Sequence, residues 1–364
     1  MSFITSIGTA NPKHKFSQHQ IADFMTRAMG LSSDEAHQLK VLYRASGIET
    51  RYSVLEDYGN ENFSFYKDNE DMEPFPSSKQ RMELFRREAT SLSKQSAEKC
   101  LSNLTLDKSE ITHLIVASCT GMFAPGLDIE LVRELGLRSN VERTSITFMG
   151  CYAAFNAIRV AKSFCAQDQN AKVLIVCTEL CSIHFQKENN EDNILANALF
   201  ADGSAALMVE SVTARKPALK IEKSYCDLVP EAQKEMAWTI GDFGFEMKLS
   251  AYVPFAIKSG IKKLTESLMA ENKITRTDIG YFAIHPGGKR ILEAIETELG
   301  MKKEDNEFAY SVLKQYGNMS SPTVLFVLQK VFGQLGARDH DKKILSFGFG
   351  PGLTLESLIL TIHV

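Results

Sequence analysis

The stretch Phe148-Met149-Gly150-Cys151-Tyr152-Ala153-Ala154-Phe155-Asn156-Ala157 decides the fold of this chain. A β-rich run over 144–148 leads into it, and a helical pattern follows Gly150 and Cys151. The small alanine side chains early in this helix would let it pack closely against its neighbours. The stretch therefore predicts a strand-to-helix turn with a cysteine at the start of the helix.

A cysteine in this position is predicted to be chemically active. Free amide donors at a helix N-terminus, together with the positive end of the helix dipole, favour anionic groups. The Cys151 thiol is therefore expected to lose its proton more readily, and the thiolate is the nucleophilic form. A small buried structural cysteine is the alternative, and the local pattern leaves both interpretations open.

Strand and helix patterns alternate along the rest of the chain. The first half has buried-type strands at 113–118, 172–178 and 205–209, and a helix at 152–167. The pattern pauses at 214–217. The second half then has strands at 279–284, 343–347 and 355–364, and helices at 253–269, 289–299 and 323–332. This alternation predicts an α/β protein with a largely buried central sheet, divided into halves 1–214 and 215–364.

Composition and charge narrow the classes of function. The chain has 364 residues, 44% of them hydrophobic, and a net charge of −4. Nothing suggests the basic surface that a nucleic-acid-binding protein needs, and no apolar run approaches the length of a membrane span. The start, Met1-Ser2-Phe3-Ile4, lacks the features of a signal peptide. We therefore expect a cytoplasmic protein that binds neither nucleic acid nor membrane.

The cysteines do not form a disulfide or metal-binding framework. There are seven of them, at irregular spacing, which favours a reduced compartment. Cys177 and Cys181 are four positions apart, but no second pair and no nearby histidine pair completes a zinc site. No metal site is predicted.

A histidine and an asparagine in the second half stand out because of their positions. His285 ends the predicted strand 279–284 and is followed by Pro286-Gly287-Gly288, so it would point into the crevice where α/β sheets bind ligands. Asn318, in Tyr316-Gly317-Asn318-Met319, could be a fixed amide donor for an oxyanion. The alternatives are a satisfied half-buried histidine and an ordinary turn asparagine.

Two further features lie close to these residues in the sequence. Ser320 or Ser321 could be the N-cap of the helix at 323–332. The glycine-rich run Gly348-Phe349-Gly350-Pro351-Gly352 lacks the Lys-Ser/Thr and the helix of a phosphate loop. A rigid turn that shapes a cavity floor is the better interpretation of this run.

Cysteine, histidine and asparagine together suit thioester chemistry. The thiolate would attack an acyl carbonyl and hold the acyl group, while imidazole and amide donors stabilise the negative charge on a thioester oxygen. One such donor contributes about 3–4 kcal/mol. Papain-like hydrolases use the same residue types, so the types alone leave the reaction open.

Several motifs resemble one family over nearly the whole chain. The chain resembles the type III polyketide synthases, the chalcone synthase-like branch of the thiolase fold, whose two similar α/β halves pack in an α-β-α-β-α arrangement. The motifs that carry the resemblance are Ile7-Gly8-Thr9-Ala10-Asn11-Pro12, Met149-Gly150-Cys151-Tyr152-Ala153, Ala198-Leu199-Phe200-Ala201-Asp202-Gly203, Ile284-His285-Pro286-Gly287-Gly288, Tyr316-Gly317-Asn318-Met319-Ser320-Ser321 and Gly348-Phe349-Gly350-Pro351-Gly352.

The resemblance implies a reaction and a role for each motif. Cys151 would take a starter acyl group from a coenzyme A thioester, and His285 would keep Cys151 ionised. His285 and Asn318 would hold the carbonyl of malonyl-CoA during decarboxylation, before a Claisen condensation. Phe200 would lie between the coenzyme A tunnel and the reaction chamber. The resemblance also implies a homodimer and no metal or organic cofactor, with acyl-CoA and malonyl-CoA as substrates.

The chain departs from the family pattern around the reaction chamber. Met247 stands at a position that usually holds Phe, and Trp238 at one that usually holds Gly. A large indole should shrink the chamber, and few extension steps are expected. The residues expected to contact substrate are Phe200, Met247, Trp238, His184, Cys119, Thr120, Gly350 and Ser320.

The donor of the acyl groups and the class of function each have alternatives. Lys40, Arg44 and Arg51 are the basic residues near the family's contacts to coenzyme A phosphates, but they cannot be equated one by one. An acyl carrier protein could therefore deliver an acyl group to a ketosynthase III-like enzyme. A non-catalytic homologue is disfavoured by the intact Cys151, His285 and Asn318. A cysteine hydrolase is disfavoured because no hydrolase motif surrounds Cys151.

Overall fold

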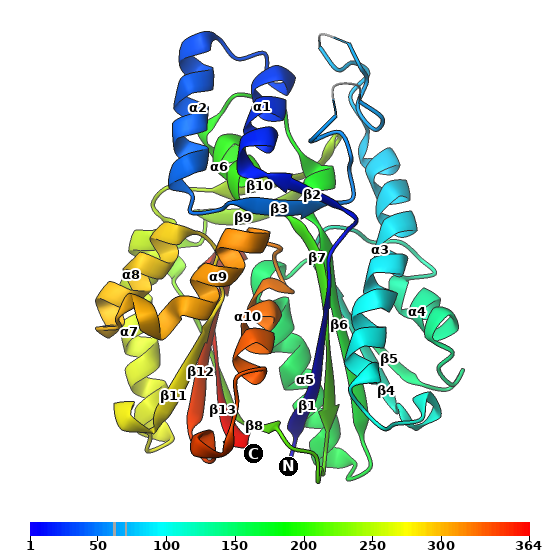
Figure 1. Ribbon diagram of the computed structural model, residues 1–364, viewed down its shortest axis with the longest axis vertical. Coiled ribbons are helices and arrows are strands. Elements are labelled where there is room, and N and C mark those ends of the chain that lie inside the picture. Colours follow the sequence, from blue (N-terminus) through cyan, green and yellow to red (C-terminus); the bar gives the residue numbers. More distant parts are fainter. Residues whose placement is uncertain (61–62, 70) are drawn as a thin grey trace.

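The computed structural model describes residues 1–60, 63–69 and 71–364 (Figure 1). The helices are α1 (Gln18–Ala28), α2 (Ser33–Ala45), α3 (Ser78–Ser102), α4 (Leu127–Leu135), α5 (Ala153–Gln167), α6 (Glu191–Leu199), α7 (Val253–Glu271), α8 (Lys289–Leu299), α9 (Glu307–Tyr316) and α10 (Thr323–Phe332). The strands are β1 (Phe3–Ala10), β2 (His14–Ser17), β3 (Thr50–Ser53), β4 (His113–Ser118), β5 (Glu142–Thr147), β6 (Lys172–Leu180), β7 (Asp202–Glu210), β8 (Ala218–Leu228), β9 (Met236–Gly241), β10 (Gly244–Leu249), β11 (Ile279–Ile284), β12 (Lys343–Gly350) and β13 (Thr354–His363).

The main sheet repeats one strand pattern in its two halves. Among the described residues, its nine strands have the order β11-β12-β13-β8-β1-β7-β6-β4-β5. In the first half, β4 and β6 are parallel, and β6, β7 and β1 follow as antiparallel neighbours. In the second half, β11 and β12 are parallel, and β12, β13 and β8 follow as antiparallel neighbours. The two halves meet through a short antiparallel pairing of β1 with β8.

Helices cover both halves of the sheet and also fill the space between them. Helix α5 contacts β4 and β6 of one half and β8 and β13 of the other, while α10 contacts β11 and also β1 and β7. Figure 1 shows these two helices at the centre, with α3 and α4 outside one half and α7 and α8 outside the other. Helix α10 is buried almost all round, as expected for a helix inside a core. The predicted α/β class with two similar halves is confirmed.

Several strands and helices that were predicted from local sequence signals are confirmed by the structure. The predicted strands at 113–118 and 279–284 and helices at 289–299 and 323–332 match β4, β11, α8 and α10 in their bounds. The division of the chain at 214/215 falls between β7 and β8 and stays a prediction. Across the parts of the chain that the structure describes, no helix is both long and apolar enough to cross a membrane.

Two local predictions near the site are wrong. The N-cap of α10 is Pro322, whose side chain makes no capping bond, and not Ser320 or Ser321. Ser320 instead has a positive φ of 57°, and its carbonyl accepts a hydrogen bond from the hydroxyl of Thr323. The residues Gly348 to Gly350 continue strand β12, so the turn is confined to Pro351–Leu353. Both errors come from chain contacts that no local pattern encodes.

Two strands that bear on function were not predicted. Strands β9 and β10 form an antiparallel hairpin in which Trp238 pairs with Met247 and Met236 with Leu249. Polar, exposed side chains at Thr239, Glu246 and Lys248 interrupt the apolar residues, so the hairpin has no continuous apolar run. No strand was therefore predicted for residues 236–249, which lie between the pause at 214–217 and the helix at 253–269.

Candidate active site

Cys151 lies in a single 3-10 turn, Gly150–Tyr152, between β5 and α5. Its side chain is buried and lines a cavity of about 30 Å³. Burial raises the pKa of the Cys151 thiol to about 12, and hydrogen bonds from Ser320 and Asn318 act in the opposite direction. The thiol therefore does not ionise easily in this closed pocket, contrary to the expectation. The loss of hydration raises its pKa by more than the hydrogen-bond donors around the sulfur lower it.

His285 follows β11 and lines the same cavity as Cys151. Its backbone N–H donates to the carbonyl oxygen of Phe347 at 2.8 Å, which ties it to β12. The side chain is 1% exposed, yet neither ring nitrogen has a hydrogen-bond partner among the residues that the structure describes. Burial lowers the pKa of the imidazole to about 3. The alternative of a satisfied half-buried histidine is wrong: this ring is neutral, fully buried and available.

Asn318 follows α9 and has its amide group held on both sides. The backbone N–H of Ser320 donates to Oδ1 at 2.8 Å, and Nδ2 donates to the carbonyl oxygen of Gly287 at 3.2 Å. An amide nitrogen has two hydrogens, and the second N–H of Asn318 is directed at the Cys151 sulfur, whose pKa it lowers. The backbone N–H of Ser320 sets the orientation of this amide group, because the amide oxygen can accept its hydrogen bond and the amide nitrogen cannot.

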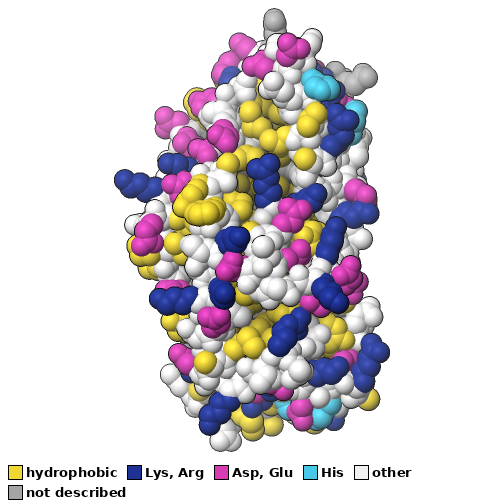
Figure 2. All heavy atoms as spheres, turned by 90° about the vertical axis from the view of Figure 1, so that its left-hand side faces the viewer, with side chains coloured by type: hydrophobic (Ala, Val, Ile, Leu, Met, Phe, Trp, Pro, Cys, Tyr) yellow, Lys and Arg dark blue, Asp and Glu magenta, His cyan; other side chains and the backbone are white. Residues whose placement is uncertain are grey.

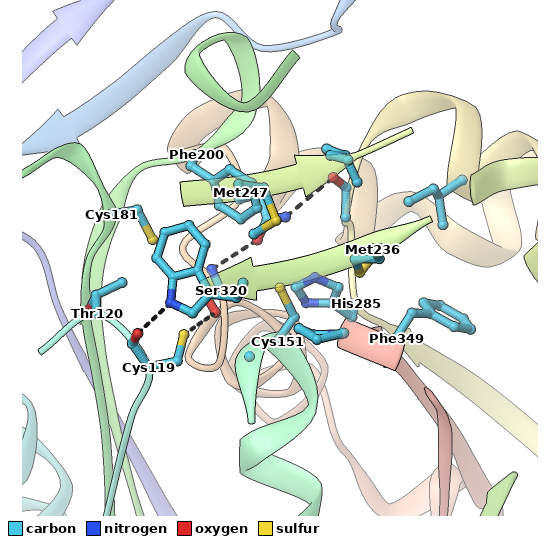
Figure 3. Close-up of a pocket in the computed structure, with 17 residues that line it drawn as sticks. Cys119, Thr120, Cys151, Cys181, Phe200, Met236, Met247, His285, Ser320 and Phe349 are labelled. Carbon is cyan, nitrogen blue, oxygen red and sulfur yellow. Dashed lines mark hydrogen bonds between the residues drawn. The ribbon is translucent and has the colours of Figure 1, made fainter. Parts of the chain in front are cut away.

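The structure brings most of the predicted substrate residues to this cavity (Figure 3). Phe200 follows α6, and Trp238 and Met247 face each other across the β9–β10 hairpin. The remaining predicted residues at the cavity are Cys119, Thr120 and Ser320. Directly opposite residues of an antiparallel pair project from the same face, which explains why one hairpin supplies both Trp238 and Met247.

His184 does not line the cavity of Cys151, and its expected contact with substrate stays a prediction. Its Nε2–H donates to the carbonyl oxygen of Thr120 at 2.7 Å, and its Nδ1 accepts from the backbone N–H of Phe245 at 2.9 Å. The ring stacks on Phe245 and lies edge-on to Trp238. His184 therefore braces the wall of the chamber, and it lines a second cavity of about 30 Å³ behind that wall.

Gly350 also lies outside the cavity, although its neighbours Phe349 and Pro351 line it. A Cβ atom at Gly350 would lie 2.5 Å from the ring of Tyr152 and 3.4 Å from the backbone nitrogen of Cys151. The glycine is therefore required by close approach to the turn that carries Cys151. Its expected contact with substrate stays a prediction.

A buried carboxyl group beside the cavity escaped the sequence analysis. Glu179, in β6, is 0% exposed and accepts from the Cys119 backbone, the Thr120 hydroxyl and the Ser321 hydroxyl at 2.9, 2.7 and 2.6 Å. Burial raises its pKa. A charged residue within the buried strand 172–180 was the signal that could have identified it.

The sequence analysis also missed part of the cavity lining. The additional lining residues are mostly apolar: Cys181, Met236, Leu249 and Ile291. Phe349 and Pro351, from the run that was expected to shape a cavity floor, line the cavity as well. Within residues 1–60, 63–69 and 71–364, no group of three or more His, Cys, Asp or Glu side chains could hold a metal ion. The site therefore combines a thiol, an imidazole and an amide with an apolar surround.

A larger groove of about 460 Å³ opens beside the catalytic cavity and shares Leu249, Gly287 and Ile291 with it. Its walls come from α2, α6, α7 and α8, and its hydrophobic lining includes Val41, Leu42, Leu195, Leu199, Val253 and Pro254. Figure 2, which faces this side of the molecule, shows hydrophobic side chains over the upper half with basic side chains among them. The basic side chains that line the groove are Lys289 and Arg290 of α8, with His37 of α2.

The basic residues singled out from the sequence are placed differently. Lys40 forms an ion pair with Asp23 at 2.7 Å, and Arg44 donates to the Lys40 carbonyl oxygen, so neither lines the groove. Arg51 is 2% exposed and faces the protein interior. A contact between Arg51 and a phosphate in the groove is thus excluded by burial.

Comparison with protein families gives two matches that together span the chain. Residues 1–213 match the N-terminal domain of chalcone and stilbene synthases, and residues 220–363 match their C-terminal domain. In sequence, the chain is 30% identical to "Probable polyketide synthase 1" of Dictyostelium discoideum over 99% of its length, but it spans only 11% of that protein. It is 28% identical to "Alpha-pyrone synthesis polyketide synthase-like Pks18" of Mycobacterium tuberculosis, covering 100% of this chain and 91% of the relative.

Solved structures agree with these matches. The C-terminal type III polyketide synthase domain of Steely1, a type I/III hybrid from Dictyostelium, superposes with a TM-score of 0.91 at 29% identity, over 100% of this chain and 99% of that chain. PKS-I from the brown alga Ectocarpus siliculosus gives a TM-score of 0.92 at 29% identity, over 100% and 98%. The thiolase fold predicted from the sequence is confirmed by these neighbours.

The fold and the relatives define an acyltransferase of the polyketide synthase class, an enzyme that condenses thioesters with loss of carbon dioxide. More narrowly, the chain belongs to the chalcone and stilbene synthase family and is a type III polyketide synthase. The reaction of this class is the loading of a starter acyl group followed by condensation with malonyl-CoA.

Proposed function

We propose that Cys151, His285 and Asn318 are the catalytic residues of this polyketide synthase. The observation that supports this assignment is their convergence on one buried cavity, with both His285 nitrogens unpartnered and the Asn318 amide held in one orientation. A structural set of these residues would have its polar atoms satisfied within the protein. The unsatisfied imidazole instead suits a group that meets its partner only when substrate is bound.

Loading of the starter begins with the thiol of Cys151. His285 takes the thiol proton, which forms the thiolate and an imidazolium that stabilises it. The thiolate attacks the carbonyl carbon of the starter thioester, and the bond from that carbon to the coenzyme A sulfur breaks. The released coenzyme A takes the proton from His285. Because burial raises the pKa of the thiol to about 12 despite the hydrogen bonds from Ser320 and Asn318, this charge pairing is what would make Cys151 nucleophilic.

Decarboxylation and condensation follow on the acylated enzyme. Malonyl-CoA loses carbon dioxide, and the electron pair left on its α-carbon delocalises onto the thioester oxygen. The second N–H of Asn318, which reaches the Cys151 sulfur in the free enzyme, and an N–H of His285 would stabilise this oxygen. The carbanion then attacks the acyl carbon on Cys151, the carbon–sulfur bond breaks, and a 3-oxoacyl-CoA is released or extended.

Coenzyme A thioesters are the proposed substrates, and the groove between α2 and α8 is the proposed route for them. It meets the catalytic cavity at Gly287 and Ile291, and Lys289 and Arg290 supply positive charge for phosphate groups. The enzyme would need no further cofactor. The alternative, a ketosynthase III-like enzyme that takes its substrate from an acyl carrier protein, is not favoured by the family matches.

The size of the chamber supports few extension steps. The catalytic cavity of about 30 Å³ exceeds the roughly 10–15 Å³ that one buried water needs, but it is small for an acyl chain. Trp238, Met247 and Phe200 stand between it and the second cavity, so a long chain needs these side chains to move. Contacts of Phe200, Met247, Trp238, Cys119, Thr120 and Ser320 with substrate are part of this proposal, as are a cytoplasmic homodimer and the halves 1–214 and 215–364.

Intact-protein mass spectrometry with a panel of acyl-CoAs tests the proposed function directly. Wild-type protein is expected to gain the mass of one acyl group, and Cys151→Ala is expected to gain none. Addition of malonyl-CoA should then give products with only a few added ketide units. Absence of acylation from every acyl-CoA would contradict the proposal, and acylation only from loaded carrier protein would favour the ketosynthase III-like alternative.

A further inference from the structure

Helix α6 ends at Leu199, next to Phe200, and the carbonyl groups at this end are all bound by other parts of the chain. The last carbonyls of a helix have no partner within the helix. Here the carbonyl of Leu199 accepts from the backbone N–H of Asn318 at 2.9 Å. The neighbouring carbonyls accept from two side chains of the N-terminal region, Arg51 and Gln18.

Arg51, in β3, makes the most contacts with this helix end. Its Nη1 donates to the carbonyl oxygens of Asn197 and Phe200 at 2.8 and 2.6 Å. A cation is also favoured here by the negative end of the helix dipole. Because the guanidinium is 2% exposed, these bonds are shielded from water and hold the backbone of Phe200 firmly.

Gln18 connects Arg51 to the same helix end. Its Oε1 accepts from Arg51 Nε at 2.9 Å, and its Nε2 donates to the carbonyl oxygen of Ala198 at 2.8 Å. Gln18 is the first residue of α1 and is itself buried. The two side chains therefore form one clamp on three carbonyls, those of Asn197, Ala198 and Phe200.

The other side of the helix end is joined to the catalytic asparagine. Phe200 and Asn318 form an isolated parallel bridge, in which the N–H of Ala201 donates to the Asn318 carbonyl at 2.8 Å. The stem of Arg51 also packs against the residue before Asn318. A Cβ atom at Gly317 would lie 2.9 Å from Cγ and Cδ of Arg51. Arg51 therefore contacts both chain segments that meet at this bridge.

We propose that Arg51, held by Gln18, is a positioning residue that sets the placement of Phe200 and Asn318 relative to each other. This inference rests on the proposed function, in which Asn318 stabilises the malonyl thioester oxygen and Phe200 contacts substrate. Arg51 touches neither substrate nor the reacting atoms. It acts through the two backbone segments that carry these residues.

The inference predicts that the two half-reactions respond differently to a change at Arg51. Acylation of Cys151 depends on the turn before α5, which Arg51 does not contact. Decarboxylation of malonyl-CoA depends on Asn318 and Phe200. A displacement of about 1 Å at a reacting group costs about 10²-fold in rate. We therefore expect Arg51→Lys, which keeps the charge but loses the forked geometry, to slow decarboxylation by about 10- to 100-fold.

The experiment measures both half-reactions on the same protein. Acylation of Cys151 is followed by single-turnover intact mass spectrometry, and decarboxylation by the conversion of malonyl-CoA to acetyl-CoA. Arg81→Lys is a matched control. Arg81 is 0% exposed and donates to the backbone carbonyls of Pro76, Ile183 and Phe185, away from α6. The Arg81→Lys variant should change the rates of both half-reactions by the same factor.

The expected result is acylation of Arg51→Lys within about 3-fold of wild type, together with the selective loss of decarboxylation. Equal loss of both half-reactions, as in the Arg81→Lys control, would overturn the inference, and so would no loss at all. If Arg51→Lys does not fold, Gln18→Leu serves in its place and should show the same split, because it removes the bond to Ala198 and the acceptor for Arg51. Failure of wild type in both half-reactions would instead count against the proposed function.

Discussion

The indole Nε1–H of Trp238 donates a hydrogen bond of 2.6 Å to the backbone carbonyl oxygen of Cys119. This bond fixes the large ring against the first half of the molecule, although Trp238 belongs to the β9–β10 hairpin. Four side chains line both the catalytic cavity and the second cavity: Cys181, Phe200, Trp238 and Met247. The indole is the largest of them, so it contributes most to the wall between the two cavities.

Replacement of this indole should enlarge the chamber. In Trp238→Ala, the catalytic cavity and the second cavity are expected to join, and longer starters or products with more ketide units should appear. Product masses from a panel of acyl-CoAs with malonyl-CoA measure this. Trp238→Phe keeps an apolar ring and is the control that should change the product range less. An unchanged product range in Trp238→Ala would show that the wall does not limit chain length.

His285 should control the ionisation of Cys151. Burial raises the pKa of the thiol to about 12 and lowers that of the imidazole to about 3. The thiolate and the imidazolium are therefore expected to form only together, each stabilised by the charge of the other. In His285→Ala, burial acts alone, and alkylation of Cys151 by iodoacetamide should climb about tenfold per pH unit up to pH ~10. Wild type should react at least about 10-fold faster at pH ~8, because the imidazolium stabilises the thiolate. Coincident pH profiles for the two proteins would contradict this role.

Asn318 should matter for decarboxylation far more than for loading. Asn318→Asp keeps an oxygen that accepts from the Ser320 backbone, but it loses the N–H donors and adds negative charge beside the developing oxyanion. Conversion of malonyl-CoA to acetyl-CoA should fall by about 10²- to 10³-fold. Acylation of Cys151 by a starter, measured by mass spectrometry, is the internal control and should fall much less, because Asn318 supplies only one of the hydrogen bonds that reach the Cys151 sulfur. A similar fall in both reactions would argue against a specific donor role.

His184 should make the protein sensitive to acid. Burial lowers its pKa from 6.5 to about 3, so between these values the unfolded chain binds a proton that the folded chain excludes. The free energy of unfolding should therefore fall as the pH drops from 6.5 toward 3, by up to about 1.4 kcal/mol per pH unit for this one group.

Gln is the test at this position because its amide can donate to the Thr120 carbonyl and accept from the Phe245 backbone, as His184 does. In His184→Gln, the pH dependence of the free energy of unfolding should lose about one proton's contribution. Urea unfolding at several pH values between 7 and 4 compares the two proteins. Parallel curves would show that His184 binds its proton equally well in both states.

Gly350 should be sensitive to a single added methyl group. The Cβ of Gly350→Ala would meet the Tyr152 ring at 2.5 Å, and the turn that carries Cys151 would have to shift. We expect slower acylation of Cys151 and a lower melting temperature. Gly336→Ala, where a Cβ meets nothing within 4 Å, is the matched control and should leave both nearly unchanged. Normal acylation in Gly350→Ala would show that the turn tolerates the shift.

The proposed catalytic residues stood out in local patterns, although these patterns alone left their roles open. Cys151 stands where a β-rich run meets a helical pattern, and His285 stands at the end of a short apolar run before Pro-Gly-Gly. Both signals depend only on residues a few positions away. The hairpin of β9 and β10 escaped prediction because alternate polar side chains hide a strand that is buried on one face only.

The sequence by itself determined the alternation of strands and helices, the turn at Cys151 and the positions of His285 and Asn318, because short-range spacing encodes them. The tertiary structure decided the rest. It turned His184 and Gly350 into supports, buried Arg51 against a helix end 149 positions away and raised the pKa of Cys151. Burial and long-range hydrogen bonds create these properties, and both arise only when distant segments pack together.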